Sequence, residues 1–131
     1  RLVRLDDNGT YETIPVKSHN WSKAGENALL VCCETVCGQF RFLFNEDAMS
    51  VTLIPAQDSS SVDWALEFSA AKDAKLPFTD IEEKVISATH GDYDYNVRLC
   101  EGEFFSEDPA FRNWRILPQG NCIVLSGVIT E

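Results

Sequence analysis

The sequence has few basic residues and no long hydrophobic run. Eleven Lys and Arg stand against 21 Asp and Glu, which gives a formal net charge of −10. Nucleic acids are bound by clustered cations. The cations here are spread singly along the chain, so we expect no nucleic-acid partner. The longest apolar run, residues 28–33, is much shorter than the ~20 apolar residues of a membrane helix, so we expect no membrane insertion.

Recognisable catalytic and cofactor-binding motifs are absent as well. The chain has no nucleophile elbow, metalloprotease helix, Walker loop or dinucleotide fingerprint. A cysteine nucleophile needs a histidine base, and the two histidines, His19 and His90, lie in segments that we interpret as a polar loop and a turn. We therefore name no catalytic residue, no cofactor and no metal. Because carboxylate pairs of glycosidases are defined in space, an enzyme is disfavoured without being excluded.

The five cysteines do not follow the spacing of a metal site. Zinc needs four converging ligands, whereas Cys32 and Cys33 would point to opposite faces of a strand, and no CxxC pair occurs. Their odd number fits free, buried thiols in a reducing compartment. One disulfide between Cys100 and Cys122 is the alternative in a secreted protein, towards which two N-glycosylation triplets point only weakly. The compartment is left open.

The sequence does have the composition of a soluble, acidic, folded domain. At 131 residues and 44% hydrophobic, the chain fits one domain spanning 1–131, since single domains cluster near ~100–150 residues. Apolar residues recur at every second position around Trp64 and again from Tyr93 to Leu99, which is typical of half-buried strands. Nine or ten such short strands predict a mainly β fold: an antiparallel β-sandwich, jelly roll or barrel.

Turn residues predict how these strands pair. Asn8-Gly9 between 2–5 and 11–16 predicts a hairpin, and Pro15 confines its second strand to an edge. Such edges leave self-association open. We predict further hairpins over 40–54 and between 114–117 and 121–128. Residues 19–27 are interpreted as a loop or one helical turn, and 28–44 as one strand that bends at Gly38.

One or two short helices complete the expected fold. Thr79 and Glu82 form a capping-box pattern, which predicts a short helix over about 80–87. The spacing of Ala71 and Ala74 also fits a helical stripe. An α+β fold with a helix near 64–75 is therefore the alternative.

Acidic residues and aromatic rings together form the candidate binding surface. Flat rings beside hydrogen-bonding side chains are typical of peptide and sugar recognition. The leading hypothesis is a non-catalytic protein-binding or assembly module of the inhibitor, immunity or structural accessory type. Its acidic, aromatic-studded surface would meet another protein that carries a basic surface. The candidate residues are Asp92, Asp94, Glu101, Glu103, Glu107, Asp108, Tyr93, Tyr95, Trp21 and Trp114.

Two other binding functions stay open. A carbohydrate-binding β-sandwich, with or without calcium, would stack sugars on the same tryptophans and tyrosines. Asp92 and Glu103 have the spacing of an EF-hand loop, but Val97 stands where that loop needs glycine, so we expect Asp94 and Asn96 on a solvated strand face. A small-ligand-binding β-barrel would instead enclose an apolar cavity.

Overall fold

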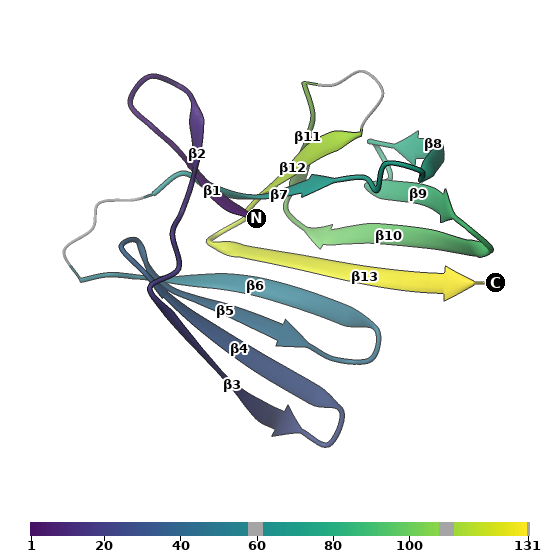
Figure 1. Cartoon of the computed structure of the whole chain (residues 1–131). Coiled ribbons are helices and arrows are strands. Elements are labelled where there is room, and N and C mark those ends of the chain that lie inside the picture. Colours follow the sequence, from purple (N-terminus) through teal and green to yellow (C-terminus); the bar gives the residue numbers. More distant parts are fainter. Residues whose placement is uncertain (58–61, 108–111, 131) are drawn as a thin grey trace.

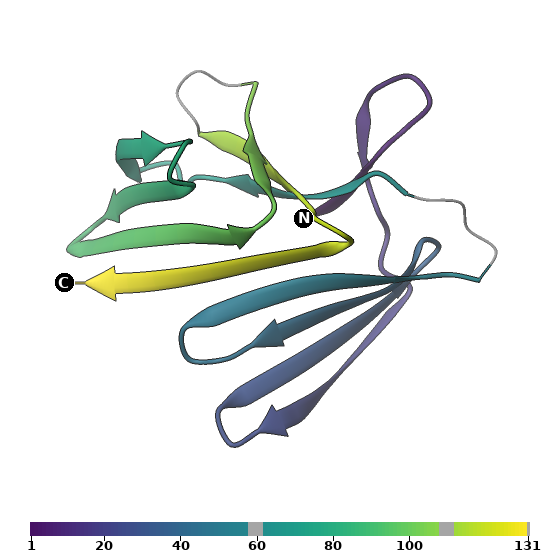
Figure 2. The same cartoon turned by 180° about the vertical axis from the view of Figure 1, so that it is seen from behind.

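The computed structural model describes residues 1–57, 62–107 and 112–130, excepting the side chains of 76–79 and 128–130. It confirms the mainly β fold: two antiparallel sheets pack against each other as a sandwich (Figures 1 and 2). The described residues form no helix and close no barrel. The barrel and the α+β alternative are therefore wrong.

The smaller sheet has five strands in the order β11-β12-β7-β1-β2. Every pair of neighbours in it is antiparallel. The strand β2 lies at one end of the sheet, just before Pro15, which confirms the edge position predicted for that strand. Its strands are β1 (Leu2–Leu5), β2 (Tyr11–Thr13), β7 (Trp64–Ser69), β11 (Glu103–Phe105) and β12 (Asn113–Leu117).

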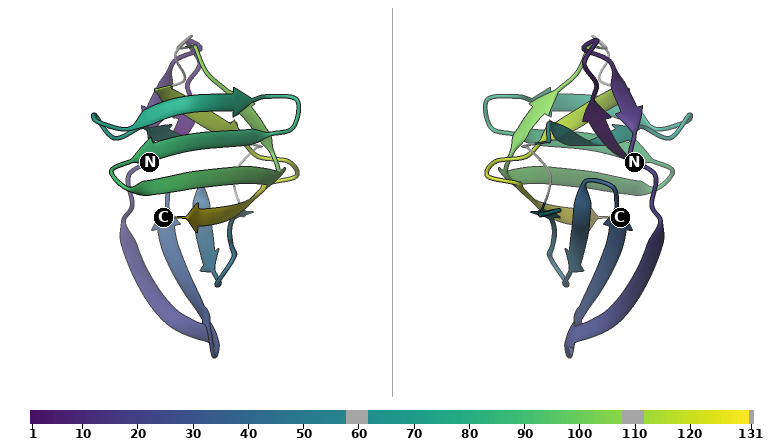
Figure 3. Two further views of the ribbon diagram at one scale, coloured as in Figure 1. Left: turned by 90° about the vertical axis from the view of Figure 1, so that its right-hand side faces the viewer. Right: turned by 90° about the vertical axis from the view of Figure 1, so that its left-hand side faces the viewer.

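The larger sheet has eight strands in the order β3-β4-β5-β6-β13-β10-β9-β8. It is strongly twisted, so that β3–β6 run in a clearly different direction from β8–β10 (Figure 3). The first four strands spread away from the smaller sheet, and we call them the wing. The strands are β3 (Ser18–Gly25), β4 (Ala28–Thr35), β5 (Gly38–Phe44), β6 (Ala48–Pro55), β8 (Lys75–Asp80), β9 (Val85–His90), β10 (Tyr93–Glu101) and β13 (Cys122–Thr130).

The core fills the space between the smaller sheet and the middle of the larger one. Trp64 from β7 and Phe40 from β5 meet edge to face, with ring centroids 5.1 Å apart. The indole Nε1–H of Trp64 donates a hydrogen bond to Oδ1 of Asn121 at 3.4 Å, so its polar atom has a partner. Ile116 and Ile123 are also fully buried. The base of the wing therefore belongs to the core.

The wing leaves the core along the strand β5. Phe40, Phe42 and Phe44 lie on one face of this strand, as the alternation predicts. Phe40 is fully buried, Phe42 is half-buried, and Phe44 is 38% exposed. The apolar face that begins in the sandwich interior thus runs out into solvent at the wing tip.

Two of the three predicted hairpins are confirmed. The strands β1 and β2 pair across Asn8-Gly9, with Gly9 at a φ of 80°. The strands β5 and β6 pair from Gly38 with Pro55 to Phe44 with Met49. The third prediction is wrong, because β12 pairs with β7 in the smaller sheet while β13 pairs with β6 and β10 in the larger one. The chain therefore crosses from the smaller sheet to the larger sheet between β12 and β13.

The predicted bend at Gly38 and the predicted loop over 19–27 are both wrong. Residues 28–44 form the hairpin β4–β5, whose register runs from Leu29 with Phe44 to Thr35 with Gly38. Gly38 has a φ of 129°, and a Cβ there would collide with the carbonyl oxygen of Ile54. The predicted loop over 19–27 lies mostly in the strand β3, which pairs with β4.

The predicted helix over 80–87 is a tight turn between β8 and β9. The backbone N–H of Glu83 donates to Oδ1 of Asp80 at 3.0 Å, and that of Lys84 donates to the carbonyl of Ile81 at 3.2 Å. Lys84 has a φ of 57°, which a helix does not allow. The segment that follows the predicted capping box is therefore closed by Asp80 as a reversal.

Candidate functional site

An apolar groove crosses the inner face of the larger sheet where the smaller sheet does not cover it. It consists of three hollows. The first, of about 360 Å³, lies at the wing tip against Trp21, Leu29 and Phe44. The second, of about 310 Å³, lies over Met49 and Leu125. The third, of about 250 Å³, opens between the two sheets and is lined by Phe68, Trp114, Ile86 and Val97.

The three hollows adjoin one another. The first two share Asn45 and Glu46, and the second and third share Tyr95 and Val97. The pairing of Phe44 with Met49, and of Met49 with Leu125, keeps the apolar floor on one face of the sheet. From β3 to β10 the groove crosses five strand-to-strand steps, which at ~4.8 Å each makes it about 24 Å long.

The charged side chains along the groove are mainly acidic. Glu26 and Glu46 line the first hollow, and Glu46 and Asp47 line the second. Lys23 is the one cation among the described residues that line these two hollows. None of the ion pairs within the described part of the chain includes any of these four side chains. The groove thus has an apolar floor and an excess of negative charge.

The structure brings three of the four predicted aromatic residues into this groove. Trp21 lies at one end and is 68% exposed, whereas Tyr95 and Trp114 lie at the other end and are half-buried. Tyr93 is exposed on the same face of β10 as Tyr95. Trp114 stacks on Phe68 with ring centroids 4.5 Å apart, so one of its faces is taken up by packing.

The predicted acidic residues are not gathered on one patch. Asp92 lies in the β9–β10 turn and Asp94 at the start of β10, whereas Glu101 ends that strand and Glu103 and Glu107 follow it. The seven residue-to-residue steps from Asp94 to Glu101 span about 23 Å of extended chain. Strand alternation also places Asp94 and Tyr95 on opposite faces. Asp108 lies outside the described residues.

The sequence that resembles a calcium loop lies on a solvated strand face, as expected. Asp94 and Asn96 are exposed, and their Oδ1 atoms accept hydrogen bonds from Thr89 Oγ1 at 2.8 Å and Ser87 Oγ at 2.7 Å. Cross-strand partners on β9 therefore occupy these oxygens. Within 1–57, 62–107 and 112–130, no three His, Cys, Asp or Glu side chains lie close enough to hold a metal ion.

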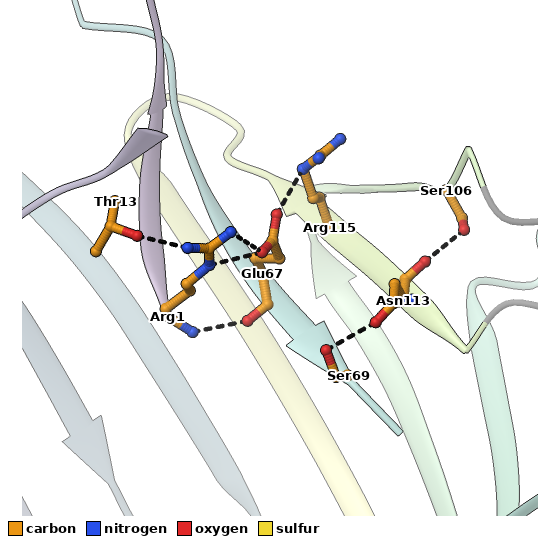
Figure 4. A network of polar contacts seen from close by, with 7 residues as sticks. All are labelled: Arg1, Thr13, Glu67, Ser69, Ser106, Asn113 and Arg115. Atoms are coloured by element: carbon orange, nitrogen blue, oxygen red, sulfur yellow. Dashed lines mark hydrogen bonds and ion pairs between the residues drawn. The ribbon is translucent and has the colours of Figure 1, made fainter. Parts of the chain in front are cut away.

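A network of polar contacts on the outer face of the smaller sheet holds neighbouring strands of that sheet together (Figure 4). Arg1 Nε and Arg115 Nε donate to the two carboxylate oxygens of Glu67 at 2.7 and 2.9 Å. The guanidinium of Arg115 also lies 4.2 Å from the ring centre of Tyr11. Burial alone would raise the pKa of Glu67, but the hydrogen bonds from the two arginines outweigh it and lower that pKa. A carboxylate paired in this way is not a general acid.

The cysteines are free thiols, as predicted, but of the five only Cys37 is fully buried. The β3–β4 register places His19 opposite Cys33, a pairing that no sequence pattern indicated. Burial raises the pKa of Cys33, and the neighbouring Cys32 and Glu34 raise it further. A reactive thiol needs a lowered pKa, so this pair does not have the electrostatics of an activated nucleophile.

Sequence reasoning missed the groove residues at the wing tip. Alternation places Phe44 on the same strand face as Phe40, but it reports which face a side chain is on and not what covers that face. The one signal available in the sequence was the polar surroundings of Trp21.

No family model, curated protein or solved structure matches this chain. The fold and the groove therefore define its class, which is an all-β sandwich with an eight-stranded sheet that extends beyond its partner sheet. Among the described residues, no helix is both long enough and apolar enough for a membrane crossing.

Proposed function

We propose that this chain is a non-catalytic protein-binding module that holds an extended segment of another protein in the groove. The observation that carries the proposal is the continuous apolar floor, which leads from the sandwich interior to an exposed tryptophan at the wing tip. Contiguous apolar surface with a polar rim is a feature of interaction sites. A groove about 24 Å long matches roughly seven residues of extended chain.

The charge of the groove favours a segment that contains basic residues. Two glutamates and an aspartate outnumber Lys23 along its rim, and the whole chain has a formal net charge of −10. Complementary charge speeds encounter and suppresses wrong partners, while aromatic anchors contribute most of the affinity in typical interfaces. An apolar segment with scattered Lys or Arg combines both features.

The test is a selection from a displayed library of random 12-residue peptides. We expect enrichment of peptides with apolar and basic residues. Replacing Phe44 with Ser should weaken their binding by about tenfold or more, because an aromatic anchor is lost. Phe105→Ser is the matched control. Phe105 is 42% exposed and Phe44 is 38% exposed, but Phe105 lines the hollow on the smaller sheet and not the groove.

Two results would contradict the proposal. One is a selection that enriches no peptide above an unrelated acidic control protein. The other is a set of enriched peptides that bind Phe44→Ser and the wild type equally well. A far-ultraviolet circular dichroism spectrum of each variant confirms that it is folded.

A further inference from the structure

The hollow at the wing tip combines two kinds of side chain that a planar cation binds. Trp21 and Phe44 contribute aromatic rings, and Glu26 and Glu46 contribute carboxylates. The hollow measures about 360 Å³, and its residues come in part from the turns β3–β4 and β5–β6. Both turns lie at the tip of the wing (Figures 1 and 2). The hollow is shallow and open to solvent, and it brings two aromatic rings and two carboxylates to one place.

We propose that this hollow binds an arginine side chain of the partner, a proposal that rests on the function inferred above. A guanidinium is planar and weakly hydrated, so it stacks on aromatic rings and donates hydrogen bonds in its own plane to carboxylates. A lysine ammonium is compact and strongly hydrated, so it gains less from the rings. The combination of Trp21 with two glutamates selects arginine over lysine.

Lys23 does not fully neutralise the two carboxylates of the hollow. Lys23 lines the same hollow, yet no ion pair in the described part of the chain joins it to Glu26 or Glu46. Two carboxylates and one ammonium leave one negative charge. An incoming guanidinium balances that charge, while Lys23 competes with it for the carboxylates.

The experiment uses a small probe and needs no identified partner. N-acetyl-arginine amide is titrated into the protein while the indole N–H signals of the tryptophans are followed by nuclear magnetic resonance. The signal of Trp21 is assigned with Trp21→Phe. We expect it to shift in a saturable way, while the buried Trp64 signal stays in place. N-acetyl-citrulline amide, which has nearly the same shape without charge, should shift it far less.

Two substitutions give opposite expected effects. Glu46→Gln should weaken binding of the arginine probe about threefold, because one exposed ion pair is lost. Lys23→Gln should strengthen it by a similar factor, because the competing cation is gone. Glu82→Gln, in the β8–β9 turn away from the hollow, should leave the affinity unchanged.

Equal shifts with the arginine and citrulline probes, or no shift at all, would overturn this inference. So would equal effects of Lys23→Gln and Glu82→Gln. The peptide selection is a separate measurement, so a groove that binds peptides without any preference for arginine would refute this inference and leave the protein-binding function standing. If no peptide is enriched while the arginine probe binds, the protein-binding function fails instead.

Discussion

The folded structure favours the charged form of the Glu67 side chain. Its carboxylate accepts hydrogen bonds from Arg1 and Arg115, which lower its pKa despite burial. A carboxylate with a lowered pKa in the folded state stabilises the protein above its unfolded pKa of about 4.3. That contribution is lost as the pH falls through the folded pKa. We expect Glu67→Gln to cost about 1–2 kcal/mol at pH 7, because two arginines lose their acceptor.

The measurement is urea unfolding at a series of pH values. The difference in stability between wild type and Glu67→Gln should be constant near neutral pH and should shrink below about pH 4.3. Glu12→Gln is the control, since Glu12 and Arg4 form a much more exposed pair, and it should cost well under about 1 kcal/mol. A Glu67→Gln penalty that grows as the pH falls would contradict this account.

At the scale of one strand, β5 should show a steep gradient of stability. Phe40→Ala removes a ring that is fully buried against Trp64, so we expect a loss of about 3–5 kcal/mol. Phe44→Ala removes a ring at the solvent end of the same face, and about 1 kcal/mol or less is expected because little buried surface is lost. Chemical denaturation of both variants tests this, and similar losses at the two positions would show that the wing tip is covered.

The β4–β5 hairpin depends on a glycine at position 38. Its φ of 129° is unfavourable for other residues, and a Cβ there would meet the carbonyl of Ile54 and lie 2.8 Å from the backbone nitrogen of Ala56. Gly38→Ala should therefore cost about 2 kcal/mol or more. Gly91→Ala is the matched control, since Gly91 has a φ of 63° with open space around it, and only about 1 kcal/mol is expected. Thermal unfolding compares the two, and equal losses would contradict the steric argument.

The elements that the sequence predicted well are those with a local signal. Two-residue alternation identified β7 and β10, and Asn8-Gly9 identified the first hairpin. The strand β3 was missed because an edge strand with every residue exposed has no apolar alternation to detect. The helix over 80–87 was predicted from the capping-box pattern of Thr79 and Glu82, but polar and acidic side chains bind backbone N–H groups in tight turns as well as at helix starts.

At the scale of the whole molecule, strand pairing across the two sheets could not be predicted. The chain moves from β12 in one sheet to β13 in the other between Leu117 and Cys122, and nothing local distinguishes that crossing from a hairpin. The groove has the same origin, since it exists only because one sheet has more strands than the sheet that covers it. A single sequence predicts which residues share a face, but the extent of the covering layer is a property of the assembled fold.

The unequal sheets should divide the molecule into regions of different stability. The strand β13 lies between β6 and β10 and carries the buried Ile123, whereas β3 has a neighbour on one side only. Local opening requires little energy where few apolar contacts are lost. Native-state hydrogen exchange should therefore find β3 amides opening at far lower free energy than β13 amides, with β5 amides protected at the Phe40 end. If β3 and β13 amides instead exchanged at one common rate, the wing would unfold only together with the core, and the division into regions of different stability would be wrong.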